Sequence, residues 1–150
     1  MMTLDMYRIP APFLMFPDGL KLFSDVPMDS KPVNIDVIPI FSDYPGRNLL
    51  GPEMMEYARR IKSIDLGERH ARAFIAQEDQ IPEKCRRLYC IFPGTKRIDP
   101  YDNIYVPYAC LRGGSWQVIW KCINDGCGWG FVAGDIIECL AVKVKGPWIH

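Results

Sequence analysis

Cysteine is the residue type in this chain whose spacing most directly suggests chemistry. The chain has six cysteines; four residues separate Cys85 from Cys90, and four separate Cys122 from Cys127. Four thiolates can hold a structural zinc ion, usually from two short turns that contain glycine. Only the second pair encloses such a glycine, Gly126. The sequence therefore favours cysteines that fill an apolar core, and a zinc-stabilised module that uses these four thiols stays open as an alternative.

Histidine is scarce, which restricts nucleophilic catalysis. Of the two histidines, His150 is the last residue and His70 stands between arginines in a predicted helix. A cysteine beside His70 in the folded protein could act as a nucleophile, because the partners of such a pair are neighbours in space rather than in sequence. No local motif supports that pair, so a surface or half-buried helix histidine is the simpler interpretation.

Glu138 is the second candidate for acid–base chemistry. In the predicted last strand, Ile136, Leu140 and Val142 occupy one face, and Glu138 falls on the same face. A carboxylate buried in an apolar row has a raised pKa and can serve as a general acid or base. A β-bulge that turns the side chain outward, or an ion pair with Arg112, would remove that role.

These candidates define the enzyme alternative, a small hydrolase or transferase that uses Glu138 or a cysteine with His70. The chain contains no recognisable catalytic set beyond them. The sequence therefore favours a protein that is not an enzyme and needs no cofactor.

Aromatic residues are the most prominent feature of the C-terminal half. Six of them lie within 29 residues of predicted sheet: Tyr101, Tyr105, Tyr108, Trp116, Trp120 and Trp129. Such side chains bury a large area, keep a polar tip and, with arginine, dominate the energetics of interfaces. We expect a binding surface that consists of Tyr105, Tyr108, Arg112, Trp116, Trp120 and Trp129. Gly128 and Gly130 would leave a strip without side chains on which a partner could lie.

The segments that must position these residues have the period-two pattern of β-strands. Strands are predicted at 87–92, 103–111, 115–123, 127–133 and 135–145. Asn124-Asp125-Gly126 favours a hairpin between the third and fourth of them. A loop of two or four residues would place the tryptophans of both arms on one face, and a loop of three would turn the second arm over.

Residues 51–81 have the three- and four-residue spacing of apolar side chains typical of amphipathic helices. Pro52 suits a first helical turn, and Gly67 is placed to end or bend the helix. A second helix would run to about residue 80, ahead of Pro82. We expect two helices packed against one face of the sheet.

The first part of the chain is rich in proline. Eight of the 13 prolines lie in residues 1–52, which leaves little room for helix. Short strands are predicted at 20–24 and 34–41, the second at a sheet edge because Pro39 cannot donate to a β-ladder. The apolar side chains of this arm, including Leu22 and Phe23, indicate that it lies across the rest of the fold.

Composition excludes several function classes. The 18 basic and 18 acidic side chains give a net charge of 0 and a pI of about 6.7, whereas a nucleic-acid-binding domain is usually strongly basic. The chain has neither a long apolar run for a membrane span nor a basic start followed by one, as in a secretory leader. We expect a cytoplasmic protein with reduced thiols, whose partners are neither nucleic acid nor membrane.

A chain of 150 residues can form one domain with a sizeable core. The predicted fold class is α+β: a proline-rich extended N-terminal arm with edge strands (1–50), two central helices (51–81) and a C-terminal antiparallel β-sheet (87–145) that could curl into a partial barrel. The predicted function is non-catalytic binding of a protein partner or a small ligand through the Tyr/Trp-rich sheet surface. Self-association into a homo-oligomer is one form of that function.

Overall fold

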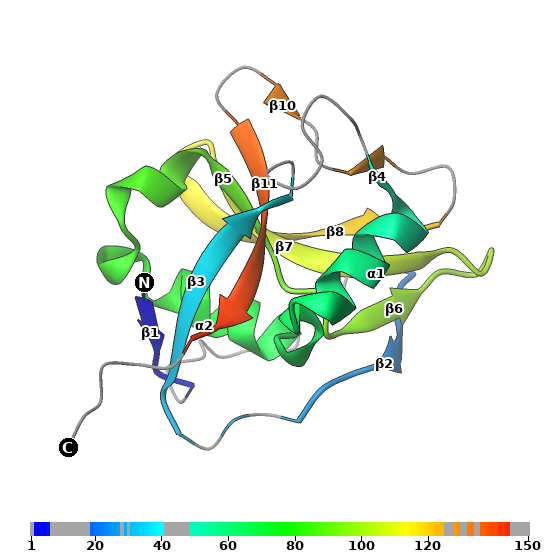
Figure 1. Ribbon diagram of the computed structural model, residues 1–150, viewed down its shortest axis with the longest axis horizontal. Helices are drawn as coiled ribbons and strands as arrows, with labels where there is room; N and C mark the ends of the chain where they lie inside the picture. Colours follow the sequence, from blue (N-terminus) through cyan, green and yellow to red (C-terminus); the bar gives the residue numbers. More distant parts are fainter. Residues whose placement is uncertain are drawn as a thin grey trace.

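A mixed β-sheet forms the centre of the structure (Figure 1). The computed structural model describes residues 2–6, 19–27, 29, 31–40, 49–124, 128–129, 132–133 and 136–144. The nine strands of this sheet are β1 (Met2–Leu4), β2 (Lys21–Ser24), β3 (Val33–Pro39), β5 (Leu88–Ile91), β6 (Lys96–Ile98), β7 (Ile104–Arg112), β8 (Ser115–Cys122), β10 (Val132–Ala133) and β11 (Ile136–Lys143). Their order is β1-β3-β11-β5-β7-β6-β2, with β8 beside β7 and β10 beside β11.

The predicted fold class is wrong. The chain is mostly sheet, with 44% strand and 28% helix, and the sheet is not closed. It is mixed because β5 and β11 run parallel, with Cys90 opposite Cys139. The N-terminal strands β1 and β3 belong to the same sheet, so residues 1–50 are not an arm with edge strands alone. Period-two patterns locate strands, but they do not say which strand pairs with which or in what direction.

The position of β3 in the sheet differs from the one predicted. It lies between β1 and β11 and is therefore an inner strand, not the edge strand predicted from Pro39. Pro39 stands at the end of β3 opposite Cys139, while β1 covers only the part of β3 near Val33 and Ile35. Near Pro39, β3 has a described neighbouring strand on one side only. A proline is tolerated at such a position because it has no N–H to donate to a β-ladder.

Two α-helices occupy the region in which helices are predicted, α1 (Gly51–Arg60) and α2 (Glu68–Ala76). Short 3₁₀ turns follow them, η2 (Ser63–Asp65), η3 (Glu78–Gln80) and η4 (Glu83–Arg87). The first helix ends before Lys62, which adopts a left-handed φ of 63°. Gly67 is the N-cap of α2 rather than the residue that ends α1.

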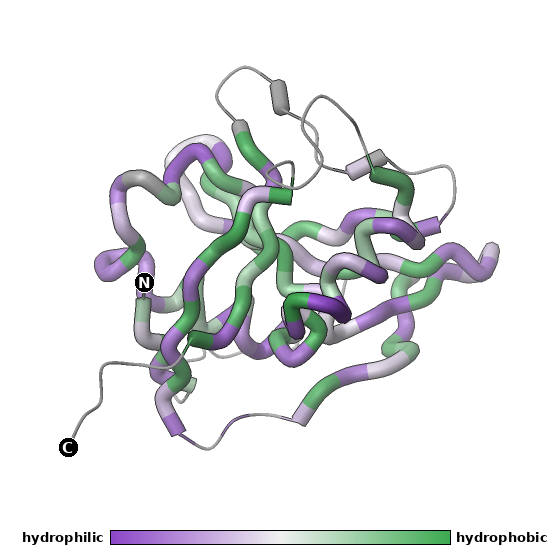
Figure 2. Tube along the Cα trace, in the orientation of Figure 1, coloured by the Kyte–Doolittle hydropathy of each residue, from purple (hydrophilic) through white to green (hydrophobic). Residues whose placement is uncertain are grey.

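The helices pack on opposite faces of the sheet, not on one face as predicted. Met54 and Tyr57 of α1 belong to a core cluster with Val106, Cys110 and other strand residues. On the other side, α2 contributes to a second cluster through side chains that include Phe74. Figure 2 shows that the inner strands are apolar along much of their length, as a sheet covered on both faces requires.

Among the described residues, the two arms of the hairpin predicted over residues 115–133 do not pair with each other. β8 pairs with β7 across a two-residue turn, Gly113-Gly114, whose φ angles of 57° and 83° only glycine adopts easily. The chain then returns so that β9 (Gly128–Trp129) pairs with β4 (Leu49–Leu50) in a separate two-stranded sheet. The tryptophans of the two expected hairpin arms are therefore not cross-strand neighbours.

We predict that Gly51→Ala destabilises the fold by about 2 kcal/mol, although alanine is a better helix former. A Cβ at Gly51 would lie 1.9 Å from the backbone oxygen of Ile123, so α1 or the end of β8 must move. Urea unfolding measures the change, and Glu56→Ala on the exposed face of α1 is the matched control, with an expected effect below about 0.5 kcal/mol. Equal stability of the two variants would contradict this contact.

Candidate functional site

A shallow cleft lies beside β2, at the turn between β6 and β7. It has a volume of about 320 Å³ and is lined by Gly19, Leu20, Asp99, Pro100, Tyr101, Tyr105 and Trp120. We call these seven residues the aromatic cleft. Its volume falls in the range of ligand pockets, but Tyr101 in its wall is 85% exposed. The cleft is therefore open to solvent.

Asp99 fixes the shape of the turn that carries two of the aromatic rings. Its carboxylate accepts hydrogen bonds from the backbone N–H groups of Tyr101 (2.8 Å) and Asn103 (2.9 Å), and from the Tyr105 hydroxyl (3.0 Å). Desolvation acts to raise the pKa of Asp99, but the hydrogen bonds from Asn103, Tyr101 and Tyr105 outweigh it and lower the pKa. Asp99 is thus ionised, and its carboxylate oxygens stabilise the turn by accepting hydrogen bonds from residues of the same loop.

The Trp120 ring packs against the buried guanidinium group of Arg97. The Arg97 guanidinium lies 5.1 Å from the centre of the Trp120 ring, and its Nη2 donates to Glu68 Oε1 of α2 at 2.9 Å. Glu68 also accepts from Arg72 at 3.3 Å. Arg97 and Glu68 are both buried, so this ion pair joins α2 to β6 inside the protein. The position of Trp120 in the cleft therefore depends on a contact between the helix and the sheet.

The edge strand β2 extends this cleft with exposed apolar side chains. Leu22 lies opposite Arg97 in the neighbouring strand, two positions along the chain from Leu20 of the cleft. Leu22 and Phe23 are 55% and 58% exposed, and Figure 2 shows apolar positions along β2 at the rim of the molecule. This part of the arm lies against the rest of the fold through its pairing with β6, as expected, but the Leu22 and Phe23 side chains are exposed. We call Leu22, Phe23 and the aromatic cleft together the β2 surface.

Exposed apolar side chains are concentrated at this place. The described residues include four large exposed hydrophobic side chains, and three of them belong to the β2 surface, namely Leu22, Phe23 and Tyr101. The fourth, Leu50, lies at the start of α1. A contiguous apolar patch is more informative than scattered apolar residues, because it costs solubility unless something binds there.

The structure divides the six residues of the predicted binding surface between the two sides of the sheet. Side chains alternate along each strand, and the core clusters show which face each one occupies. The α2 side holds Tyr105, Trp116 and Trp120, and the α1 side holds Tyr108, Arg112 and Trp129. Only Tyr105 and Trp120 line the aromatic cleft, so the expected single aromatic face does not exist.

Most of the other predicted aromatic residues are core residues. Trp116 packs edge-on against Phe74 at 5.5 Å between ring centres, and Tyr108 stacks on Tyr89 at 5.0 Å. Burial raises the pKa of Tyr108 to about 12, so its hydroxyl stays protonated. Trp129 is fully buried and donates from Nε1 to the Cys122 carbonyl at 3.1 Å. Alanine at Trp129 would remove core packing, so this residue does not report on binding.

The sequence pattern places Glu138 correctly on an apolar face, and its partner is Lys121 rather than Arg112. Glu138 is buried, and its Oε2 lies 2.9 Å from Lys121 Nζ. The pairing of β11 with β5 runs without interruption from Ile137 to Leu140, so no bulge turns the side chain outward in that ladder. Lys121 Nζ also lies 4.3 Å from the centre of the Trp129 ring. The buried carboxylate is therefore part of an ion pair with a partly exposed lysine.

Both ring nitrogens of His70 are engaged. The Gly67 backbone N–H donates to Nδ1 at 3.0 Å, so the proton of the neutral ring is on Nε2, which lies 2.6 Å from Asp29 Oδ2. Lys143 Nζ donates to the other oxygen of Asp29 at 3.1 Å. His70 is fully buried in this arrangement. It has no nitrogen left with which to activate a cysteine, so the geometry gives no support to a catalytic Cys–His70 pair.

The charge states of this pair follow from its surroundings. Burial lowers the pKa of His70 from 6.5, and this outweighs the hydrogen bond to Asp29, which acts in the opposite direction. Burial alone would raise the pKa of Asp29, but its hydrogen bonds with His70 and Lys143 bring it below 3.8. At neutral pH the pair is thus a neutral imidazole that donates to a carboxylate.

The predicted zinc cysteines are not brought together in the part of the chain that the structure describes. Cys90 lies opposite Cys139, and Cys122 Sγ at the end of β8 contacts Asn124 Oδ1 at 3.4 Å. Cys127 is outside the described residues. Within them, no three His, Cys, Asp or Glu side chains form a group that could hold a metal ion. Burial raises the pKa of Cys90 well above 9.0 and that of Cys139 to about 12, so these thiols stay protonated.

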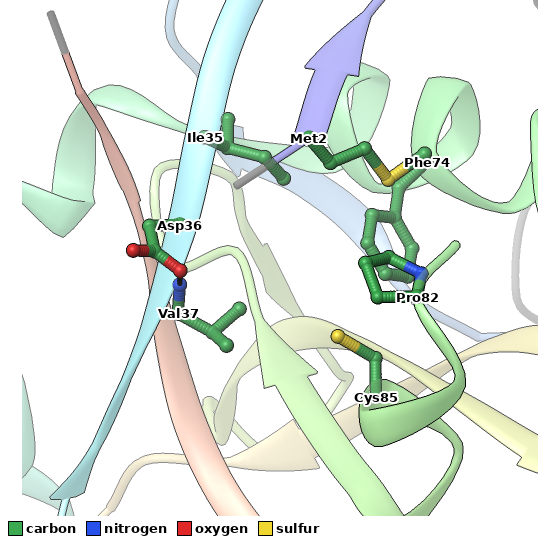
Figure 3. A pocket seen from close by; sticks show the side chains of 7 residues that line it. All are labelled: Met2, Ile35, Asp36, Val37, Phe74, Pro82 and Cys85. Carbon is green, nitrogen blue, oxygen red and sulfur yellow. Dashed lines mark hydrogen bonds between the residues drawn. The ribbon is translucent and has the colours of Figure 1, made fainter. Parts of the chain in front are cut away.

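A second cavity lies between β3, α2 and η4 (Figure 3). Its lining is largely apolar: Met2, Ile35, Asp36, Val37, Phe74, Pro82 and Cys85. The Asp36 carboxylate accepts from its neighbour Val37 N–H at 2.9 Å, and the Cys85 sulfur points toward the cavity in Figure 3. The space measures about 10 Å³, which is room for one water molecule at most. It is a packing defect rather than a ligand site.

A third depression, of about 380 Å³, lies on the outer side of α1 and is lined by Pro52, Glu53, Glu56, Tyr57 and Arg60. Arg59 forms an exposed ion pair with Glu56 at 2.9 Å, and Arg60 covers the Tyr57 ring at 5.3 Å. None of its lining residues belongs to the large exposed hydrophobic side chains of the described chain. This surface is an ordinary charged helix face.

The turn that shapes the cleft is not among the elements predicted from the sequence. Asp99, Pro100 and Asn103 are typical turn residues, and an aspartate followed two to four residues later by N–H donors is a common turn motif. That signal could have placed Tyr101 on a projecting turn beside Tyr105. The exposure of Leu22 and Phe23 carries no sequence signal, because apolar strand residues are more often buried.

We predict that His70 makes the protein less stable on mild acidification. His70 has a lower pKa in the fold than its unfolded value of 6.5, so its contribution is present above that value and is lost as the pH falls below it. Urea unfolding at about pH 7.5 and about pH 5.5 should show a loss of up to about 1.4 kcal/mol per pH unit. His70→Gln should remove this pH dependence, whereas His150→Gln should retain it. The reverse pattern would show that the pH dependence does not come from His70.

A second prediction concerns the buried pair. Lys121→Met removes the ammonium group that pairs with Glu138, and we expect a loss of about 2 kcal/mol in unfolding free energy, below the value for a fully buried pair because Lys121 is partly exposed. The double variant Lys121→Met with Glu138→Leu should recover most of that loss, because both charges are then removed. Thermal and urea unfolding of the single and double variants form the test. Strictly additive effects would mean that the two side chains are not coupled.

Comparison with known proteins adds no further information. No protein-family model matches the chain, and neither a curated protein nor a solved structure matches it. No helix among the described residues is long and apolar enough to cross a membrane.

Proposed function

We propose that this chain is a non-catalytic binding protein that engages a protein partner through the β2 surface. The observation that carries the proposal is the exposure of Tyr101 in the aromatic cleft and of Leu22 and Phe23 on β2, the strand that follows Leu20 of the cleft. Aromatic and aliphatic anchors over a recess are typical of the energetic centre of a protein interface.

The shape of the surface favours a protein over a small ligand. A small-ligand pocket usually encloses most of its ligand, whereas Tyr101 in the cleft wall is 85% exposed. The apolar surface also continues beyond the cleft along β2, over Leu22 and Phe23. A partner that fills the cleft with one side chain and covers the strand with others would use the whole patch.

Charged residues flank the exposed apolar side chains of β2. Lys21 and Asp25 are exposed at the two ends of the β2 segment, and an interface usually has such a polar rim around an apolar centre. The overall charge of 0 offers no electrostatic attraction to nucleic acid. The free thiols of Cys90, Cys110 and Cys139, which are buried, are compatible with a cytoplasmic location, which we also propose.

The acid–base candidates support a non-catalytic role. Glu138 is paired with Lys121 in the core, and both nitrogens of His70 are used by Gly67 and Asp29. Neither group lines the aromatic cleft. Both predicted acid–base groups are therefore engaged in holding the fold.

The test uses site-specific photocrosslinking. A benzophenone amino acid at position 23 or 101 of the full chain should, after irradiation in extract of the source cells, give a defined adduct band. The same probe at position 50 should not, because Leu50 is a similarly exposed apolar residue outside the β2 surface.

Competition by unlabelled protein provides the quantitative control. Wild-type protein and Leu50→Ser should suppress the adducts equally, whereas Phe23→Ser with Tyr101→Ser should suppress them at least tenfold less. All three proteins should have the same circular dichroism, because the substituted side chains are exposed. Absence of adducts at positions 23 and 101, or equal suppression by the three proteins, would show that the β2 surface is not a binding site.

A further inference from the structure

We propose that the partner of the β2 surface is a second copy of this chain, bound through antiparallel pairing of two β2 strands about a two-fold axis at Phe23. This inference rests on the proposed function, because it names the occupant of the same surface. Among the described strands, β2 is the end of the sheet and pairs only with β6. Its outer edge therefore has backbone groups available for another strand.

The charge pattern of the segment is complementary to itself. The chain reads Lys21-Leu22-Phe23-Ser24-Asp25, so antiparallel pairing centred on Phe23 places Lys21 of each copy opposite Asp25 of the other. Directly opposite residues of antiparallel strands share one face of the sheet, and opposite charges there are favourable. The two-fold axis creates two such ion pairs on either side of a Phe23–Phe23 contact, and it repeats every contact in both copies.

Asp25 is fixed in position before a partner arrives. Its Oδ1 accepts from the Thr95 hydroxyl at 2.5 Å and from the Val26 backbone N–H at 2.8 Å. Thr95 in turn accepts from the N–H of Glu68 at the start of α2. The carboxylate that would receive the Lys21 ammonium is thus already ordered, which lowers the entropic cost of the ion pair.

Phe23 occupies the position in β2 that suits a two-fold contact. The register with β6 shifts between Leu22 and Ser24, so Phe23 is the extra residue of a β-bulge and has no partner in β6. Its side chain is 58% exposed. Aromatic pairs across antiparallel strands stabilise the pairing, and the contact would cover the side chain that β6 leaves exposed.

The small size of the contact sets the strength of association. A pairing of five residues is only about 17 Å long, and the interface would be smaller than that of a stable dimer. We therefore expect a weak dimer with a dissociation constant on the order of 100 µM. Such a dimer is monomeric at low concentration and exchanges rapidly.

Analytical ultracentrifugation of the full chain from about 10 µM to about 1 mM tests the proposal through a charge swap. Wild-type protein should shift toward dimer as the concentration rises. Lys21→Asp should weaken the dimer about tenfold or more, because it places like charges opposite each other, and Asp25→Lys should do the same. An equimolar mixture of the two variants should restore the dimer. Lys62→Asp, at an exposed lysine outside β2, should behave as wild type.

Asp25→Lys also removes the contact with Thr95, so a second variant tests the register independently. Phe23→Cys should crosslink to itself through a disulfide under mild oxidation by copper phenanthroline, because the two-fold axis brings the two Cα atoms within disulfide range. Tyr101→Cys should crosslink at least tenfold more slowly, and wild-type protein gives the background from native thiols.

The outcomes separate this inference from the proposed function. A wild-type protein that stays monomeric at 1 mM, a dimer unaffected by Lys21→Asp, or equal crosslinking at positions 23 and 101 would overturn self-pairing. If the photocrosslinked adducts at positions 23 and 101 then contain a different protein, the proposed function stands while the second copy is excluded. If no adduct forms either, both are wrong.

Discussion

The buried ion pair between Glu68 and Arg97 is the contact on which the arrangement of this protein depends most. It joins the first turn of α2 to β6, and the same guanidinium lies over the Trp120 ring. Two buried charges are stable only when they are paired, so the helix and the strand must keep one relative position. That position sets where β2 lies, because Leu22 is opposite Arg97. The candidate binding surface is thus placed by an interaction inside the core.

A sheet with a helix on each face explains why the aromatic residues are divided. Each strand must bury side chains in both directions, and neighbouring residues of β8 therefore enter different clusters, Val118 on the α2 side and Ile119 on the α1 side. Trp129 joins the α1 side because β9 pairs with β4. Aromatic density in the sequence reports the strand positions with large side chains, but the pairing of the strands decides which of those rings meet and which remain accessible.

Local patterns predicted local structure. The apolar spacing from Met54 onward corresponds to α1, because a helix is fixed by residues close in sequence. The parallel contact between Cys90 and Cys139 joins residues 49 positions apart, and no local pattern encodes it. For the same reason Tyr105 and Trp120 could be proposed as binding residues, whereas their grouping with Leu20 across the sheet could not. Strand alternation put Glu138 on the apolar face but left open whether the side chain is buried there. Its burial and its pairing with Lys121 depend on the tertiary arrangement.

The bulge in β2 has a consequence for behaviour in concentrated solution. An apolar strand at the end of a sheet ordinarily invites stacking of many chains into fibrils. The shift of register between Leu22 and Ser24 bends the strand and shortens its straight part, so the edge is a poor template for a long continuous ladder. An assembly made by two identical edges is also finite, since each molecule has used its only β2 once the pair has formed. The protein can thus expose Leu22 and Phe23 without the risk of open-ended polymerisation that a flat edge would carry.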